Sequence, residues 1–186
     1  MFVKYGASAR CSSGVKVSWV VVGKATVVGY STAMSDAGEA RQWIYRHRLT
    51  VRFRDCDAMG HVNHAVYFTY FEQCRLTFWR EVAGTPSPHT RVIIARAECD
   101  YRAPAHFGDE LEVRLRVGDI GRSSFTLEYA IVDAATDRQV ATGKTVMVSY
   151  DYERGKSTPL PESTRGLLDR LQQGLGPGSY RGQTGV

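Results

Sequence analysis

Polar side chains that could do chemistry gather in one short segment of this 186-residue chain. Residues 55–67 read Asp-Cys-Asp-Ala-Met-Gly-His-Val-Asn-His-Ala-Val-Tyr and include two carboxylates, two imidazoles and an amide. Turns often contain Asp and Asn, which bond the backbone, so polarity alone would mean little. This segment, however, leads directly into an apolar, helix-like stretch, and the N–H groups at a helix start attract negative charge. The segment is therefore suited to chemistry on a carbonyl group.

Asp57 could act as a general base toward water, or it could attack a carbonyl carbon directly. The sequence does not choose between these two routes. We expect backbone N–H groups near residues 65–67 to stabilise the negative charge that develops on the carbonyl oxygen. His61 or His64 could polarise the carbonyl, orient the water or protonate the leaving group. We take all three side chains as catalytic candidates.

The remaining polar groups of the segment have simpler explanations. We expect Asp55 to bond the turn and Asn63 to be the N-cap of the helix. Cys56 lies between two aspartates, whose charge should raise the thiol pKa and weaken it as a nucleophile. His61, His64 and Asp57 have no further ligand pattern around them, so we predict no metal site.

A strand and a helix must position this segment. Residues 45–54 alternate strictly between apolar and polar, which predicts a half-buried strand with Phe53 on its inner face. Its outer face is a row of arginines that we interpret as solvated, although such a row could bind phosphates. Residues 64–83 carry aromatic and aliphatic side chains at helical spacing on more than one face. A helix with so much apolar surface must be enclosed, so we place it at the centre of the fold.

The later part of the chain alternates like strands. We predict strands over residues 91–103, 110–119, 123–133 and 138–150, with Gly- and Asp-containing turns between them. Residues 162–175 are predicted to form a short helix, followed by a disordered Gly-rich tail over residues 176–186. The fold class is therefore α+β, with a single antiparallel sheet of about five strands wrapped around one long helix.

At this point the chain resembles the hotdog-fold thioesterases, in particular the 4-hydroxybenzoyl-CoA thioesterase-like acyl-CoA thioesterases. The resemblance covers roughly residues 45–151. Its marks are the run of residues 55–63, Tyr67-Phe68 with Phe71-Glu72, and residues 101–104 leading to residues 108–111. In this order and combination they are fairly specific.

The resemblance implies that Asp57, just before the central helix, is the catalytic carboxylate. It implies that the helix start polarises a thioester carbonyl, and that the site lies at the interface of a dimer whose sheets join edge to edge. Members of this family often form tetramers, so we expect a homodimer or a homotetramer. Seven residues after the catalytic Asp, one branch of the family carries His and another carries Asn within a Gly-His-Val-Asn-Asn run. This chain has His64 there, with His61 and Asn63 as well, so it mixes the two patterns.

We therefore expect an acyl-CoA thioesterase that forms a free carboxylic acid and CoA without a cofactor or a metal. Asn63, Val66 and Tyr67 at the helix start are candidates for substrate binding. Arg122 and Ser123 lie in a turn that could bind the CoA nucleotide, although a plain β-turn explains them equally well. Two alternatives stay open, a thioesterase that acts on acyl-carrier protein and a non-catalytic acyl-CoA-binding protein on the same scaffold.

Composition limits the partners and the compartment. The net charge of +5 favours anionic partners weakly, and because no nucleic-acid-binding motif accompanies it, we expect no nucleic-acid partner. Four cysteines without paired spacing are typical of reduced thiols, which indicates the cytoplasm. We expect residues 1–44 to be a disordered extension, with Met34 as an alternative start. Lysines interrupt the Val-rich stretch within them, so we predict neither a membrane span nor a signal peptide.

Overall fold

The computed structural model describes residues 9–10, 16–22, 25–31, 42–82 and 91–174. The chain divides into two compact units, Met1–Ala40 and Arg41–Val186. In the first unit, strands β1 (Ala9–Arg10), β2 (Lys16–Val22) and β3 (Ala25–Ser31) form an antiparallel sheet in that order. From the sequence alone we expect no regular structure there. The difference follows from the many β-branched residues of β2 and β3, which favour strands.

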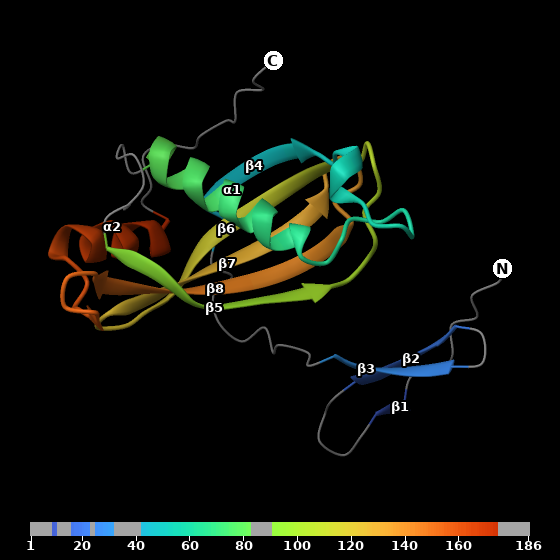
Figure 1. The fold of residues 1–186 in the computed structure, drawn as a ribbon, viewed down its shortest axis with the longest axis horizontal. Helices are drawn as coiled ribbons and strands as arrows, with labels where there is room; N and C mark the ends of the chain where they lie inside the picture. Colours follow the sequence, from blue (N-terminus) through green and yellow to red (C-terminus); the bar gives the residue numbers. More distant parts are fainter. Residues whose placement is uncertain (1–8, 11–15, 23–24, 32–41, 83–90, 175–186) are drawn as a thin grey trace. The chain divides into compact units, whose positions relative to one another are not determined.

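The second unit contains the main sheet. Its strands are β4 (Tyr45–Thr50), β5 (Val92–Tyr101), β6 (Glu110–Ile120), β7 (Ser124–Asp133) and β8 (Gln139–Asp151), in the antiparallel order β4-β6-β7-β8-β5. The short strand β9 (Lys156–Ser157) pairs with β8. Helix α1 (Val66–Val82) lies across one face of this sheet, and α2 (Glu162–Gln172) lies at one end of it (Figure 1). The predicted α+β fold with a sheet around one long helix is confirmed.

Close packing between α1 and the centre of the sheet forms the core. The ring of Phe71 stacks on Tyr129 of β7, with ring centroids 4.6 Å apart. Beside them, Gly143 of β8 has no side chain, and a Cβ there would lie 2.3 Å from the Phe71 ring. Glycine at this position therefore lets α1 sit directly on the sheet.

The predicted strand over residues 45–54 is too long. Strand β4 ends at Thr50, and residues 53–55 form the single-turn helix η1, in which Phe53 is 80% exposed. The alternation continues in the sequence, but the backbone N–H of Arg52 bonds the carboxylate of Asp55 and closes a turn. Phe53 therefore does not lie on an inner strand face, which corrects the prediction.

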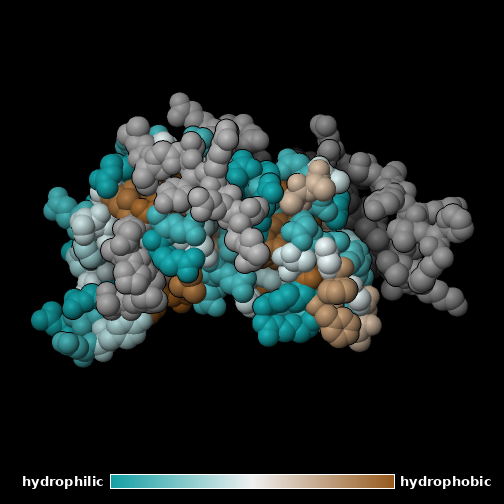
Figure 2. Space-filling model, turned by 90° about the horizontal axis from the view of Figure 1, so that it is seen from above, coloured by the Kyte–Doolittle hydropathy of each residue, from teal (hydrophilic) through white to brown (hydrophobic). Residues whose placement is uncertain are grey.

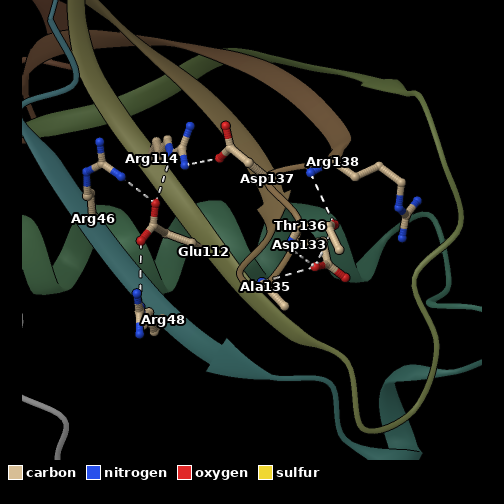
Figure 3. A network of polar contacts seen from close by, with 9 residues as sticks. All are labelled: Arg46, Arg48, Glu112, Arg114, Asp133, Ala135, Thr136, Asp137 and Arg138. Carbon is tan, nitrogen blue, oxygen red and sulfur yellow. Dashed lines mark hydrogen bonds and ion pairs between the residues drawn. The ribbon is translucent and has the colours of Figure 1, made fainter.

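The arginines of β4 are paired rather than free. On the sheet face turned away from α1, Glu112 of β6 is buried among Arg46, Arg48 and Arg114 (Figure 3). Arg46 lies 2.7 Å from the Glu112 carboxylate, Arg114 lies 2.8 Å from it and Arg48 lies 3.6 Å from it. Arg114 also bonds Asp137, in the β7–β8 turn. Two arginines of the predicted row, Arg46 and Arg48, are therefore already paired with a carboxylate and are less suited to bind a phosphate.

The short C-terminal helix is confirmed as α2, which ends three residues earlier than predicted. The predicted disordered tail, residues 176–186, lies outside the described residues, and so do the proposed start at Met34 and the residues around it. The domain boundaries therefore stay predictions.

None of the helices that the structure describes is long and apolar enough to cross a membrane. Figure 2 shows hydrophobic side chains as separate patches among hydrophilic ones on the face in view.

Candidate active site

A tight hairpin carries Asp57 and His61 between β4 and α1. The backbone N–H of Asp57 donates to the carbonyl of His61 at 2.8 Å, and Gly60 N–H donates to the carbonyl of Asp57 at 3.0 Å. Gly60 has φ +82°, a conformation that side-chain-bearing residues rarely adopt. The hairpin thus brings Asp57 and His61 together.

The carboxylate of Asp57 is half-buried. Its Oδ1 accepts a hydrogen bond from the Met59 backbone N–H at 2.9 Å. Within the part of the chain that the structure describes, the carboxylate makes no further hydrogen bond, so its Oδ2 can accept one from water or a substrate. A carboxylate with one oxygen held and the other unbonded can take a proton from water.

Asp55 anchors the hairpin to α1 and is 3% exposed. Its carboxylate accepts hydrogen bonds from the Arg52 backbone and guanidinium at 3.0 Å and from the Tyr70 hydroxyl at 2.9 Å. Its backbone carbonyl accepts the N–H of Asn63 at 2.9 Å. Burial raises the pKa of Asp55, but the hydrogen bonds from Arg52 and Tyr70 outweigh it, so the pKa lies below its usual value. The prediction that Asp55 bonds the turn is confirmed.

The loop before β6 fixes the other side of the hairpin. Val62 N–H donates to the carbonyl of Ala105 at 2.8 Å, and the rings of His61 and His106 meet with centroids 5.5 Å apart. The Nδ1 atom of His106 lies 3.8 Å from an Asp109 carboxylate oxygen. His106 is not apparent as a site residue in the sequence, because it follows a proline-containing loop and has no local motif of its own.

Asn63 caps the start of α1, as predicted. Its side-chain oxygen accepts the Ala65 N–H at 3.0 Å, and its carbonyl accepts the Val66 N–H at 2.9 Å. These two amides already have acceptors, so the expectation that they stabilise an oxyanion is corrected. Of the amides at residues 65–67, the one of Tyr67 remains a candidate.

The predicted residues at the helix start differ in exposure. Tyr67 is buried, and its ring packs against Tyr101 with centroids 5.1 Å apart. His64 is exposed, and its carbonyl accepts the Tyr101 hydroxyl at 2.9 Å. Val66 is half-buried. Tyr101, whose motif carried part of the resemblance, therefore ties the end of β5 to the start of α1, a role that the sequence did not reveal.

Arg122 and Ser123 lie at the opposite end of the sheet from Asp57. Strand β6 begins beside the hairpin, where Glu110 pairs with Thr50, and it runs for roughly 30 Å to the turn that holds these two residues. There the Arg122 carbonyl accepts the N–H of Leu160 at 3.0 Å. Within one chain, the structure does not bring them to the other predicted site residues.

A cavity of about 200 Å³ lies between α1 and the β5–β8 side of the sheet. It is lined by Phe68, Thr69, Phe71, Glu72, Arg75, Ile94, Ala97 and Thr145. Phe68 belongs to the first turn of α1, so the cavity begins close to the helix start. An apolar cavity of about 150 Å³ holds benzene, so this one can hold an acyl group of similar size or larger.

Among the described residues, no cluster of three or more His, Cys, Asp or Glu side chains could hold a metal ion.

Comparison with known proteins gives the family. The model of the thioesterase-like superfamily matches residues 51–168. The chain belongs to this superfamily.

Related sequences and structures agree with this assignment. A putative esterase of Aquifex aeolicus is 33% identical over 68% of this chain and 97% of its own length. A 1,4-dihydroxy-2-naphthoyl-CoA hydrolase of Synechococcus elongatus is 31% identical over 69% of this chain and 95% of its own. A thioesterase of Thermus thermophilus, solved with coenzyme A and zinc, is 34% identical over 70% of this chain and 96% of its own, with TM-score 0.62. The chain is thus a thioester hydrolase.

Proposed function

We propose that this enzyme hydrolyses acyl-CoA thioesters to the free carboxylic acid and CoA, with Asp57 as the catalytic carboxylate. One observation carries the proposal: Asp57 is half-buried, lies on the hairpin that leads into α1 and has one oxygen held by the Met59 amide. The cavity that begins at Phe68 offers space for the acyl group beside it. The hairpin with the base thus leads into the helix whose first turn opens the acyl pocket.

In the proposed reaction, Asp57 takes a proton from water while the water oxygen bonds to the thioester carbon. The carbonyl electron pair moves onto oxygen, where the amides of His64 and Tyr67 are our candidates to stabilise it. When the carbonyl re-forms, the carbon–sulfur bond breaks and CoA leaves as a thiolate, which takes up a proton. His61 adjoins Asp57 across the hairpin and is suited to orient the water, and exposed His64 is suited to contact the thioester.

Direct attack by Asp57 is the other chemical route. It would form a mixed anhydride between Asp57 and the acyl group, which water would then hydrolyse. A single turnover in ¹⁸O-labelled water detects an anhydride that water opens at the Asp57 carbonyl, because the label then enters the protein. The general-base route, like attack of water on the acyl carbon of an anhydride, puts the label only into the released acid.

We further propose that two chains pair edge to edge through β5. This strand pairs with β8 on one side, and its other side is an edge of the described sheet with Ile94 exposed. The beginning of β5 lies near the turn of Ser123, because Val92 pairs with Ser149, whose N–H donates to the Ser123 carbonyl. The end of β5 lies near the start of α1, because the Tyr101 hydroxyl donates to the His64 carbonyl.

Two β5 strands that pair in antiparallel fashion place the beginning of one beside the end of the other. The turn that holds Arg122 of the partner subunit would then lie near the hairpin of Asp57. Arginine binds phosphates well, so this turn is suited to the CoA nucleotide. The dimer would thus unite the predicted site residues that one chain keeps apart.

The test of this function is a screen of acyl-CoA thioesters with detection of the free thiol. We expect release of CoA from short, medium or aromatic acyl-CoAs by the protein without added metal. The same acyl groups on acyl-carrier protein form the comparison, and we expect slower release from that carrier. Tight binding of acyl-CoA without turnover would refute the proposal, and a preference for the protein carrier would reassign the substrate.

A further inference from the structure

Arg75 is an arginine with little contact to water, on the helix that lines the acyl cavity. It is 7% exposed, although a buried cation loses much of its hydration and needs partners. Its acidic partner is Glu72, one turn earlier on α1, at 3.5 Å. That distance is long for an ion pair, and the Glu72 side chain is 57% exposed. The charge of Arg75 is therefore only loosely compensated.

Two hydroxyl groups complete the surroundings of Arg75. Burial raises the pKa of Tyr129, whose hydroxyl lies 3.2 Å from the Thr145 hydroxyl, and the charge of the Arg75 guanidinium acts to lower that pKa by less. A guanidinium has five N–H donors, more than Glu72 and Tyr129 can accept. Arg75, Glu72 and Thr145 all line the cavity, so Arg75 borders a space that a ligand can enter.

The rest of the cavity wall suits a hydrocarbon chain. Phe68, Phe71, Ile94 and Ala97 supply apolar surface. Phe68 lies in the first turn of α1, and Arg75 lies seven residues further on, about 10 Å along the helix axis. Long side chains on a helix point back toward its N-terminus, which shortens the distance from the helix start to the guanidinium. An acyl group of about six carbons would thus have its far end at Arg75.

We propose that Arg75 selects an acyl group that carries a carboxylate at its far end. This inference rests on the proposed acyl-CoA hydrolysis and names its substrate class, the CoA thioesters of short dicarboxylic acids. The ligand carboxylate would accept two parallel hydrogen bonds from the guanidinium, which is the geometry that arginine favours. Glu72 would give up its loose contact and turn into water, where a carboxylate is well solvated.

Adipoyl-CoA and hexanoyl-CoA test this, because their acyl groups have six carbons and differ only in the terminal group. We expect kcat/KM of the wild type to be roughly 10- to 100-fold higher for adipoyl-CoA, the range for hydrogen bonds to charged groups. Arg75→Met should remove the preference and keep hexanoyl-CoA hydrolysis. Glu72→Gln should increase the preference, since it removes the competing carboxylate.

Arg80→Met is the matched control, because Arg80 is an exposed arginine further along the same helix and should leave the ratio unchanged. The ratio of kcat/KM for adipoyl-CoA to kcat/KM for hexanoyl-CoA in the wild type tests the inference even if Arg75→Met does not fold. If the wild type hydrolyses hexanoyl-CoA as fast as adipoyl-CoA, this inference is overturned and the proposed function stays intact. The same holds if it hydrolyses neither of these two but does hydrolyse another acyl-CoA. A wild type that hydrolyses no acyl-CoA at all would overturn the proposed function itself.

Discussion

Asp55 and Asp57 lie two residues apart, but their different surroundings indicate different roles. Asp55 is buried and receives hydrogen bonds from Arg52 and Tyr70. Asp57 is half-buried, and among the described residues its carboxylate receives one hydrogen bond, from the Met59 amide. We interpret the first as the anchor of the hairpin and the second as the reactive group, because a carboxylate that is saturated with donors is a weak base.

The depressed pKa of Asp55 predicts how stability depends on pH. Its folded-state pKa lies below the unfolded value of about 3.9, so its stabilisation is present above that pH and is lost as the pH falls through the folded pKa. Asp55→Asn should destabilise the protein by roughly 1.5–3 kcal/mol at pH 7 and flatten the loss of stability in acid. Urea denaturation between pH 3 and pH 7 measures both effects.

Asp100→Asn is the control for that experiment, because Asp100 is exposed and pairs only with Arg102, at 3.5 Å, among the described residues. It should change neither stability nor its pH dependence. If Asp55→Asn also behaved like the wild type at every pH, Asp55 would not be the anchor that the hydrogen bonds indicate.

At this scale the sequence singled out Asp57 and His61 as candidates from their residue types, and the structure places both on one hairpin. It misplaced Phe53, since a period of two continues past Thr50 while Asp55 turns the backbone. It also assigned an oxyanion role to amides that Asn63 occupies. In both cases a hydrogen bond from the backbone to a side chain, that of Asp55 or Asn63, decides the structure, and the apolar–polar pattern of the sequence does not reveal it.

At the scale of elements, the contact between α1 and β8 depends on a missing side chain. Gly143→Ala would place a Cβ 2.3 Å from the Phe71 ring and 3.0 Å from the carbonyl of Glu98. Because Phe71 is fully buried and stacked on Tyr129, it has little room to move. We expect a loss of roughly 1–3 kcal/mol in the free energy of unfolding, measured by chemical denaturation.

Gly166→Ala is the matched control on α2. Its Cβ would meet only the end of the Arg170 side chain, at 3.7 Å, so this variant should be as stable as the wild type or more so by up to about 1 kcal/mol. Equal stability of Gly143→Ala and the wild type would mean that α1 does not sit on the sheet as closely as described.

The strands of the main sheet and both of its helices could be predicted because alternation and helical spacing are properties of single segments. Where the segments end up relative to one another is not such a property. Arg122 and Ser123 read as neighbours of the site, yet β6 carries their turn to the far end of the sheet. The β5 edge was likewise visible only once the strand order was known.

At the scale of the whole molecule, the proposed dimer predicts complementation between variants. Asp57→Asn and Arg122→Ala should each reduce activity, because each damages every site. After subunit exchange, heterodimers would hold one intact site made from Asp57 of one chain and Arg122 of the other. Activity should then rise to about a quarter of the wild-type value, the share of intact sites among random dimers.

Each variant taken through the same exchange treatment alone is the control and should gain nothing. Light scattering accompanies the test, with a mass that is an even multiple of the 20.7 kDa chain expected. A mass of one chain, or mixtures no more active than their parts, would contradict a site shared between subunits.

The most direct test of the central claim is turnover by Asp57→Asn. The amide keeps the shape of the side chain and an oxygen for the Met59 N–H, but it cannot take a proton from water. We expect acyl-CoA hydrolysis to fall by roughly 10²- to 10⁴-fold while the melting temperature stays that of the wild type. Wild-type turnover by this variant, correctly folded, would show that the carboxylate of Asp57 is not the catalytic group.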